Sequence, residues 1–92
     1  MAVTVRIPQL LRTLTQGERE VQVDATTLRE AIDALEQRYP GIRERLVNGE
    51  GEIHRFVNLF VNDEDVRLMA GLETRLPEGA EISIVPAMAG GC

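Results

Sequence analysis

The last residues of the chain carry its most distinctive chemistry. The sequence ends Met88-Ala89-Gly90-Gly91-Cys92, and two consecutive glycines form a thin arm that can enter clefts closed to residues with a Cβ atom. Such an arm suits a protein whose own terminal carboxylate must reach the active site of another enzyme. Cys92 covers the carboxylate of Gly91, so any function proposed for the arm must also account for the cysteine.

The rest of the sequence offers no convincing catalytic or metal-binding set. The one histidine, His54, and the one cysteine, Cys92, lie far apart in the sequence, and no pair of residues has the spacing of metal ligands. Ser83 lacks the Gly-x-Ser-x-Gly setting of a hydrolase nucleophile. The acidic run at 63–65 fits a solvated turn better than a paired-carboxylate site. We therefore predict no metal site and no enzyme activity of the chain by itself.

Composition and charge are those of a single small globular domain. The chain has 92 residues, 43% of them hydrophobic, and a formal net charge of -5. Dispersed negative charge argues against nucleic acid and against an anionic membrane surface as partners. No apolar run approaches the length of a membrane span, and the first residues lack the features of a secretory signal. We therefore expect a cytoplasmic protein.

Hydrophobic periodicity predicts the secondary structure. Alternation of apolar and polar residues predicts strands at 2–7, 19–24, 53–61 and 80–85, with a short return strand that begins at 66–67. Thr27 and Glu30 form a capping-box pattern that predicts a helix to about residue 39, with Pro40 and Gly41 as its stop. A short helical turn is expected at 42–47. An apolar trio should fold the loop after the first strand onto the core: Leu10, Leu11 and Leu14.

The predicted order, β-β-α-β-β-β, indicates an α+β fold. Because each element has one apolar side to bury, the economical packing is a mixed sheet of about five strands with one main helix across one face. This is the β-grasp, or ubiquitin-like, arrangement, with the first and last strands side by side. The last strand would then run through the middle of the sheet. We accordingly divide the chain into a domain at 1–86 and a flexible arm at 87–92.

The predicted strand at 53–61 has two different faces. Its core side consists of alternating aliphatic residues, and its other side carries Phe56, Asn58 and Phe60. We assign Phe56 to a second core layer and Phe60 to partner docking, because an exposed aromatic residue near the arm would anchor a partner protein. Met88, on the arm itself, is assigned to the same docking role.

Two segments give the chain a family resemblance. The run at 56–67, Phe-Val-Asn-Leu-Phe-Val-Asn-Asp-Glu-Asp-Val-Arg, and the run at 84–91, Ile-Val-Pro-Ala-Met-Ala-Gly-Gly, resemble the ThiS/MoaD superfamily of sulfur carriers. The likeness extends over the whole chain and is strongest to the CysO-type carriers of bacterial cysteine synthesis. A Gly-Gly end alone would be weak evidence, whereas its combination with the turn at 61–67 is more specific.

The resemblance implies a role for each residue of the arm and a set of partner enzymes. An adenylating and sulfur-transferring activating enzyme, using ATP and magnesium, would adenylate Gly91, and a sulfur donor would convert the adenylate into a thiocarboxylate. Ala89 and Gly90 would deliver this group. A PLP-dependent cysteine synthase would then use the sulfur, and a zinc-dependent JAMM-type peptidase would release the product. The carrier itself would bind no cofactor, no metal and no nucleic acid.

Cys92 departs from the family pattern, which ends at Gly-Gly. Three explanations remain open. Cys92 is an encoded residue that a peptidase trims, or it is newly made cysteine still attached to the carrier, or it is an engineered mimic of that adduct. We favour an adduct or its mimic over an encoded residue. In each case Gly91 is held in an amide and cannot be adenylated in the chain as printed.

Other functions fit the same arm. Within the superfamily, the chain could be the small subunit of molybdopterin synthase or a sulfur carrier for thiazole synthesis, and genomic neighbours or pull-down partners would separate these. A ubiquitin-like protein modifier would instead form isopeptide bonds with target lysines and give high-mass ladders on blots. A plain β-grasp interaction module with an inert arm would keep its function after truncation of residues 90–92.

Overall fold

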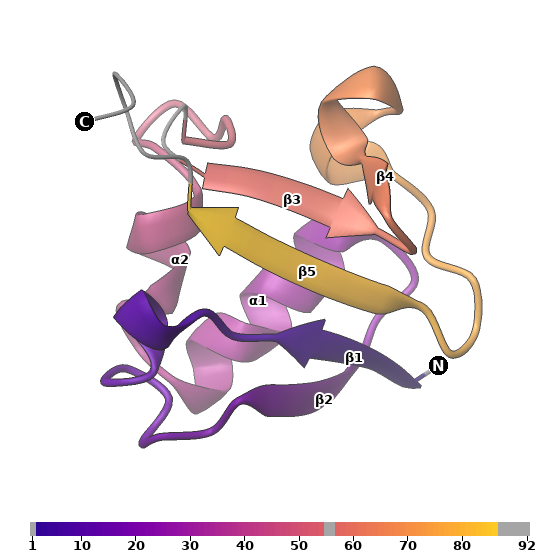
Figure 1. Ribbon diagram of the computed structural model, residues 1–92. Helices are drawn as coiled ribbons and strands as arrows, with labels where there is room; N and C mark the ends of the chain where they lie inside the picture. Colours follow the sequence, from indigo (N-terminus) through magenta and orange to yellow (C-terminus); the bar gives the residue numbers. More distant parts are fainter. Residues whose placement is uncertain (1, 55–56, 87–92) are drawn as a thin grey trace.

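The computed structural model describes residues 2–54 and 57–86. They form one five-stranded sheet in the order β2-β1-β5-β3-β4, with the helices on one face of it (Figure 1). The strands are β1 (Ala2–Arg6), β2 (Glu20–Asp24), β3 (Val57–Val61), β4 (Glu64–Asp65) and β5 (Glu81–Pro86). The helices are α1 (Leu28–Arg38) and α2 (Ile42–Leu46), with short 3-10 turns η1 (Gln9–Leu11), η2 (Val66–Leu68) and η3 (Gly71–Glu73).

The sheet is mixed, as the sequence predicts. β1 and β2 form an antiparallel hairpin, β1 and β5 are parallel neighbours, and β3 is antiparallel to β5. The predicted adjacency of the first and last strands is therefore confirmed, and β5 occupies the centre of the sheet. A parallel pair needs a long connection between its strands, and here α1 lies within that connection. The arrangement is a β-grasp fold.

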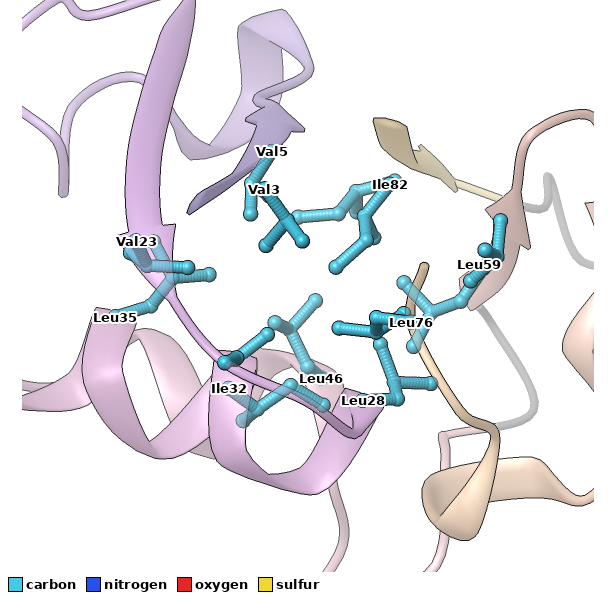
Figure 2. Packing of buried hydrophobic residues seen from close by; sticks show 14 of the residues in the cluster. Val3, Val5, Val23, Leu28, Ile32, Leu35, Leu46, Leu59, Leu76 and Ile82 are labelled. Carbon is cyan, nitrogen blue, oxygen red and sulfur yellow. The ribbon is translucent and has the colours of Figure 1, made fainter. Parts of the chain in front are cut away.

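The hydrophobic core lies between the sheet and α1. The helix buries the stripe that the sequence predicts: Leu28, Ala31, Ile32 and Leu35. Figure 2 shows Val3, Val5 and Ile82 of the strands meeting Leu28 and Ile32 of the helix. The sheet buries alternate residues of each strand because successive side chains point to opposite faces. Among the described residues, neither α-helix covers the outer face of the sheet (Figure 1).

The first turn of α1 is capped, with one difference from the predicted capping box. The Thr27 hydroxyl oxygen accepts a hydrogen bond from the Glu30 backbone N–H at 3.3 Å. The Glu30 carboxylate reaches one residue beyond Thr27 and accepts from the backbone N–H and the hydroxyl of Thr26, at 2.8 and 2.7 Å. Thr26 offers two donors, and its backbone N–H is the largest cause that lowers the pKa of Glu30 below its ordinary value.

The structure corrects the bounds of two predicted strands. The strand expected at 53–61 begins at Val57, because Ile53 forms an isolated bridge with Val47. The return strand expected to begin at 66–67 consists instead of Glu64–Asp65. Residues 66–68 turn into η2 because the Asp65 carboxylate accepts a hydrogen bond from the Arg67 backbone N–H at 2.9 Å. Local side-chain bonds of this kind compete with strand pairing.

Candidate functional site

The candidate site is the corner of the sheet from which the arm begins. β5 ends at Pro86, which lies opposite Val57 at the start of β3, and Figure 1 shows this corner beside α2. The arm residues to which the sequence assigns the chemistry and its delivery lie outside the described residues: Met88, Ala89, Gly90, Gly91 and Cys92. Their roles therefore remain predictions, and the structure defines the platform that precedes them.

The last residues of β5 have a strand on one side only. β1 pairs with Glu81, Ile82 and Ser83 of β5 and with no later residue of that strand, whereas β3 pairs with β5 as far as Pro86. The chain after β1 turns away at Pro8 into η1. The end of the central strand is therefore held mainly by β3, and the opposite side of this end is left for side chains of the loop after β1.

Side chains of the loop after β1 border a groove of about 290 Å³ beside the end of β5. Leu10, which the sequence places against the core, is instead 71% exposed, whereas Leu11 and Leu14 do pack on the core as expected. Arg45 of α2 adds a positive charge at the rim. The full lining is Pro8, Leu10, Leu11, Arg45, Val57, Ile84 and Pro86. Sequence reasoning missed this groove because it joins four segments that are far apart in the sequence.

The outer face of the sheet carries an aromatic residue and, closer to this corner, an aliphatic one. Phe60 is half-buried and lies between Asp65 of β4 and Ser83 of β5. Val85, opposite Asn58, is 42% exposed. Phe60 thus lies on the outer face, as expected of a docking residue, although docking itself stays a prediction. Phe56 lies outside the described residues. Val85, which immediately precedes Pro86, extends the apolar surface.

Arg67 holds the start of β3. Its Nη1 atom donates to the Asn58 side-chain oxygen at 2.6 Å, and its Nη2 atom donates to the backbone carbonyls of His54 and Val57, at 2.8 Å in each case. Sequence reasoning included Arg67 only as the last residue of the run at 56–67 and assigned it no role of its own, because its contacts depend on where η2 lies relative to β3.

The residues considered and rejected as chemical sites have structural roles. The His54 ring nitrogen Nε2 lies 3.1 Å from the Glu44 carbonyl oxygen, and Ser83 lies within β5. Asn62 and Asp63 adopt positive φ angles in a turn. In the part of the chain that the structure describes, no three potential metal-ligating side chains come together, and no helix has the length and hydropathy to span a membrane.

The Glu36 carboxylate, whose pKa is lowered, fixes the start of α2, the helix that supplies Arg45 to the groove. Glu36 of α1 accepts hydrogen bonds from the backbone N–H groups of Arg43, at 2.9 Å, and Gly41, at 3.1 Å. These bonds, that of Arg43 first, lower the pKa of Glu36 below its ordinary value, against an opposing effect of desolvation. Gly41 has a φ angle of 103°, a conformation that favours glycine. Glu36 of α1 therefore ties α1 to the start of α2.

Comparison with known proteins agrees with the fold. The model of the ThiS family matches residues 5–91. The sulfur carrier protein CysO of Mycobacterium tuberculosis is 48% identical over 99% of this chain and 100% of its own. Among solved structures, the complex of BexX and CysO from Amycolatopsis orientalis gives a TM-score of 0.91 at 50% identity, covering 97% of this chain and 99% of that one. Crystalline CysO of M. tuberculosis gives 0.90 at 46% identity, with coverage of 94% and 99%. The chain therefore belongs to the ThiS family and is a sulfur carrier protein similar to CysO.

Proposed function

We propose that this protein carries sulfur as a thiocarboxylate at Gly91 for the synthesis of cysteine. The observation that supports this most directly is the family match, which extends through Gly91 itself. The structure supports it as well, because the central strand ends at Pro86 and five residues, 87–91, then follow to Gly91. Five extended residues reach about 17 Å, enough to enter the active site of an activating enzyme.

The first stage is the activation of the Gly91 carboxylate. Whatever follows Gly91, which is Cys92 in the printed sequence, must be removed before the carboxylate is free. An activating enzyme then transfers the adenylyl group of ATP to the carboxylate, with magnesium on the nucleotide, and pyrophosphate leaves. A sulfide equivalent attacks the acyl carbon and AMP leaves, which produces the thiocarboxylate. Gly91 presents the acyl carbon without a side chain to obstruct either attack.

The second stage transfers the sulfur. The thiocarboxylate sulfur adds to an aminoacrylate that a PLP-dependent cysteine synthase forms from O-phosphoserine. The acyl group then moves from sulfur to nitrogen, so that cysteine is joined to Gly91 through a peptide bond. A zinc-dependent JAMM-type peptidase hydrolyses that bond and regenerates the carrier. In this scheme Cys92 is the attached product or its mimic, or a residue that the same class of peptidase removes.

The described residues contribute a docking platform to this scheme and no catalytic groups. Phe60 and Val85 provide an apolar outer face beside the root of the arm, and Met88 would extend it along the arm. A similar carrier from A. orientalis is known in complex with BexX, which supports recognition of this kind of platform by a partner protein. An aromatic residue at the centre of such a surface commonly supplies much of the binding energy.

The experiment compares two forms of the chain, one ending at Gly91 and one ending at Cys92. Each is incubated with an activating enzyme, ATP, magnesium and sulfide, and its intact mass is measured. We expect the form ending at Gly91 to exchange one oxygen for sulfur and the form ending at Cys92 to stay unchanged until it is treated with a JAMM-type peptidase. An unchanged mass of the Gly91 form, with an authentic carrier as positive control, would contradict the proposal.

A further inference from the structure

The contacts of Arg67 meet at the point where β3 begins. The guanidinium donates to carbonyl oxygens on both sides of residues 55 and 56, those of His54 and Val57, and to the side chain of Asn58. The His54 carbonyl also accepts the Val57 backbone N–H at 3.1 Å. Arg67 therefore ties His54 to the first two residues of β3, with hydrogen bonds strengthened by its charge.

The same two strand residues hold the end of β5. Val57 lies opposite Pro86, and Asn58 lies opposite Val85. β1 pairs with β5 no further than Ser83. Among the described strands, the end of β5 thus has β3 alone beside it. Its position depends on how firmly the start of β3 is fixed.

The number of acceptors explains why an arginine holds the start of β3. A guanidinium has five N–H donors in a rigid plane, so one group can reach several acceptors at fixed angles. The backbone of Arg67 is itself fixed, because its N–H donates to the Asp65 carboxylate at 2.9 Å. Asp65 belongs to β4, which pairs with β3. The side chain of Arg67 therefore extends from an anchored turn.

We propose that Arg67 is a positioning residue that fixes the root of the C-terminal arm by holding the start of β3 against the end of β5. The inference rests on the proposed function of Gly91 for its kinetic consequence, although its structural consequence is independent of that function. Without the guanidinium, residues 57–58 and 85–86 separate more often. The arm then becomes effectively longer and its end is less concentrated at the reacting centre.

The structural test measures hydrogen exchange by NMR in Arg67→Gln and in a matched variant, Arg38→Gln. Arg38 is a suitable control because it also donates to a backbone carbonyl, that of Gln22 in β2, at 2.8 Å and at an exposed site. We expect the amides of Val57 and Val85 to exchange roughly ten-fold faster in Arg67→Gln and not in Arg38→Gln. Unchanged exchange at both amides in Arg67→Gln would overturn the proposal without bearing on sulfur transfer.

The functional test measures steady-state thiocarboxylation of chains ending at Gly91. We expect Arg67→Gln to lower kcat by about two- to ten-fold with little change in KM. The substitution leaves the docking surface of Phe60 and Val85 unchanged, but the arm then presents Gly91 to the enzyme less often in the reactive position. Arg67→Lys should recover little activity, because an ammonium group cannot match the planar fork. A raised KM that lysine rescues would instead make Arg67 a charged docking residue, which contradicts the positioning role.

The two tests distinguish failure of this inference from failure of the proposed function. A wild-type chain that is never thiocarboxylated contradicts the role of Gly91 and leaves the hydrogen-exchange result to decide the role of Arg67. Should Arg67→Gln unfold, Asn58→Ala removes one acceptor of the same guanidinium and is expected to produce a smaller acceleration at Val57 and Val85. No acceleration in a folded Asn58→Ala variant would then contradict the positioning role of Arg67.

Discussion

Glu36 of α1 accepts a hydrogen bond from the backbone N–H of Arg43 in α2 at 2.9 Å, so a single carboxylate joins two helices. Since the bond favours the ionised form, the pKa of Glu36 is lowered in the folded state. A lowered folded-state pKa stabilises the protein above the unfolded-state pKa, and this contribution is lost as the pH falls through the folded value.

We therefore expect Glu36→Gln to be less stable than the wild type at pH 7 and to approach it below about pH 4, where an ordinary glutamate becomes protonated. Urea denaturation of both proteins across this range measures the difference. Glu44→Gln is the control, because the Glu44 side chain makes no hydrogen bond with another described residue of the chain. A constant difference between wild type and Glu36→Gln at all pH values would contradict the linkage.

Truncation of Leu59 tests the packing of β3 on the core. Leu59 is 1% exposed and lies opposite Ile84 of β5. We expect Leu59→Ala to lower the free energy of unfolding by about 2–5 kcal/mol, through lost burial and the cavity that remains. Chemical denaturation measures this loss, and Val85→Ala, at an exposed position on the opposite face, should cost much less. Equal losses for the two variants would show that the assigned faces are wrong.

Removing the N-terminal cap of α1 should lower the free energy of unfolding by less than Leu59→Ala does. Thr27→Ala removes the hydroxyl that accepts the Glu30 backbone N–H and should lower the free energy of unfolding by about 1 kcal/mol. Thr13→Ala is the matched control, since Thr13 is exposed and lies outside the helices. Helicity by circular dichroism and thermal unfolding would both be measured, and identical unfolding of the two variants would exclude a contribution of the cap.

The docking surface is tested by a polar substitution at its exposed edge. Val85→Ser should raise the KM of the activating enzyme several-fold while the free energy of unfolding changes little, since Val85 is 42% exposed. Leu68→Ser is the control, because Leu68 is 87% exposed but belongs to η2. If both variants leave KM unchanged, the outer face near Phe60 and Val85 is not where the enzyme binds.

Substitutions in the arm should separate chemistry from stability. Gly90→Val and Gly91→Val add a branched side chain next to the acyl carbon and should lower the rate of thiocarboxylation by more than about ten-fold. Their Tm should equal that of the wild type, because the platform ends at Pro86. Gly49→Ala, in an open loop position, should affect neither quantity. Normal activity of both arm variants would refute the role of the diglycine.

The sequence by itself determined the elements whose signals are local. The stripe of Leu28, Ala31, Ile32 and Leu35 repeats with the period of a helix, and it is buried as predicted. Val57, Leu59 and Val61 alternate as a strand with one buried face requires. Because each element has one apolar side, their order leaves few compact packings. The fold and the position of the arm at the end of the central strand follow from these signals.

The tertiary structure alone decided how the root of the arm is held. Arg67 bonds to His54 and Val57, and Leu10 lies exposed beside Ile84 and Pro86 at the groove. These contacts join side chains to backbone groups or to segments distant in the sequence. Such contacts leave no period or motif, because they depend on the relative placement of strands and turns. Periodicity specifies which side of an element is buried, whereas only the assembled sheet specifies which residues meet at its corner.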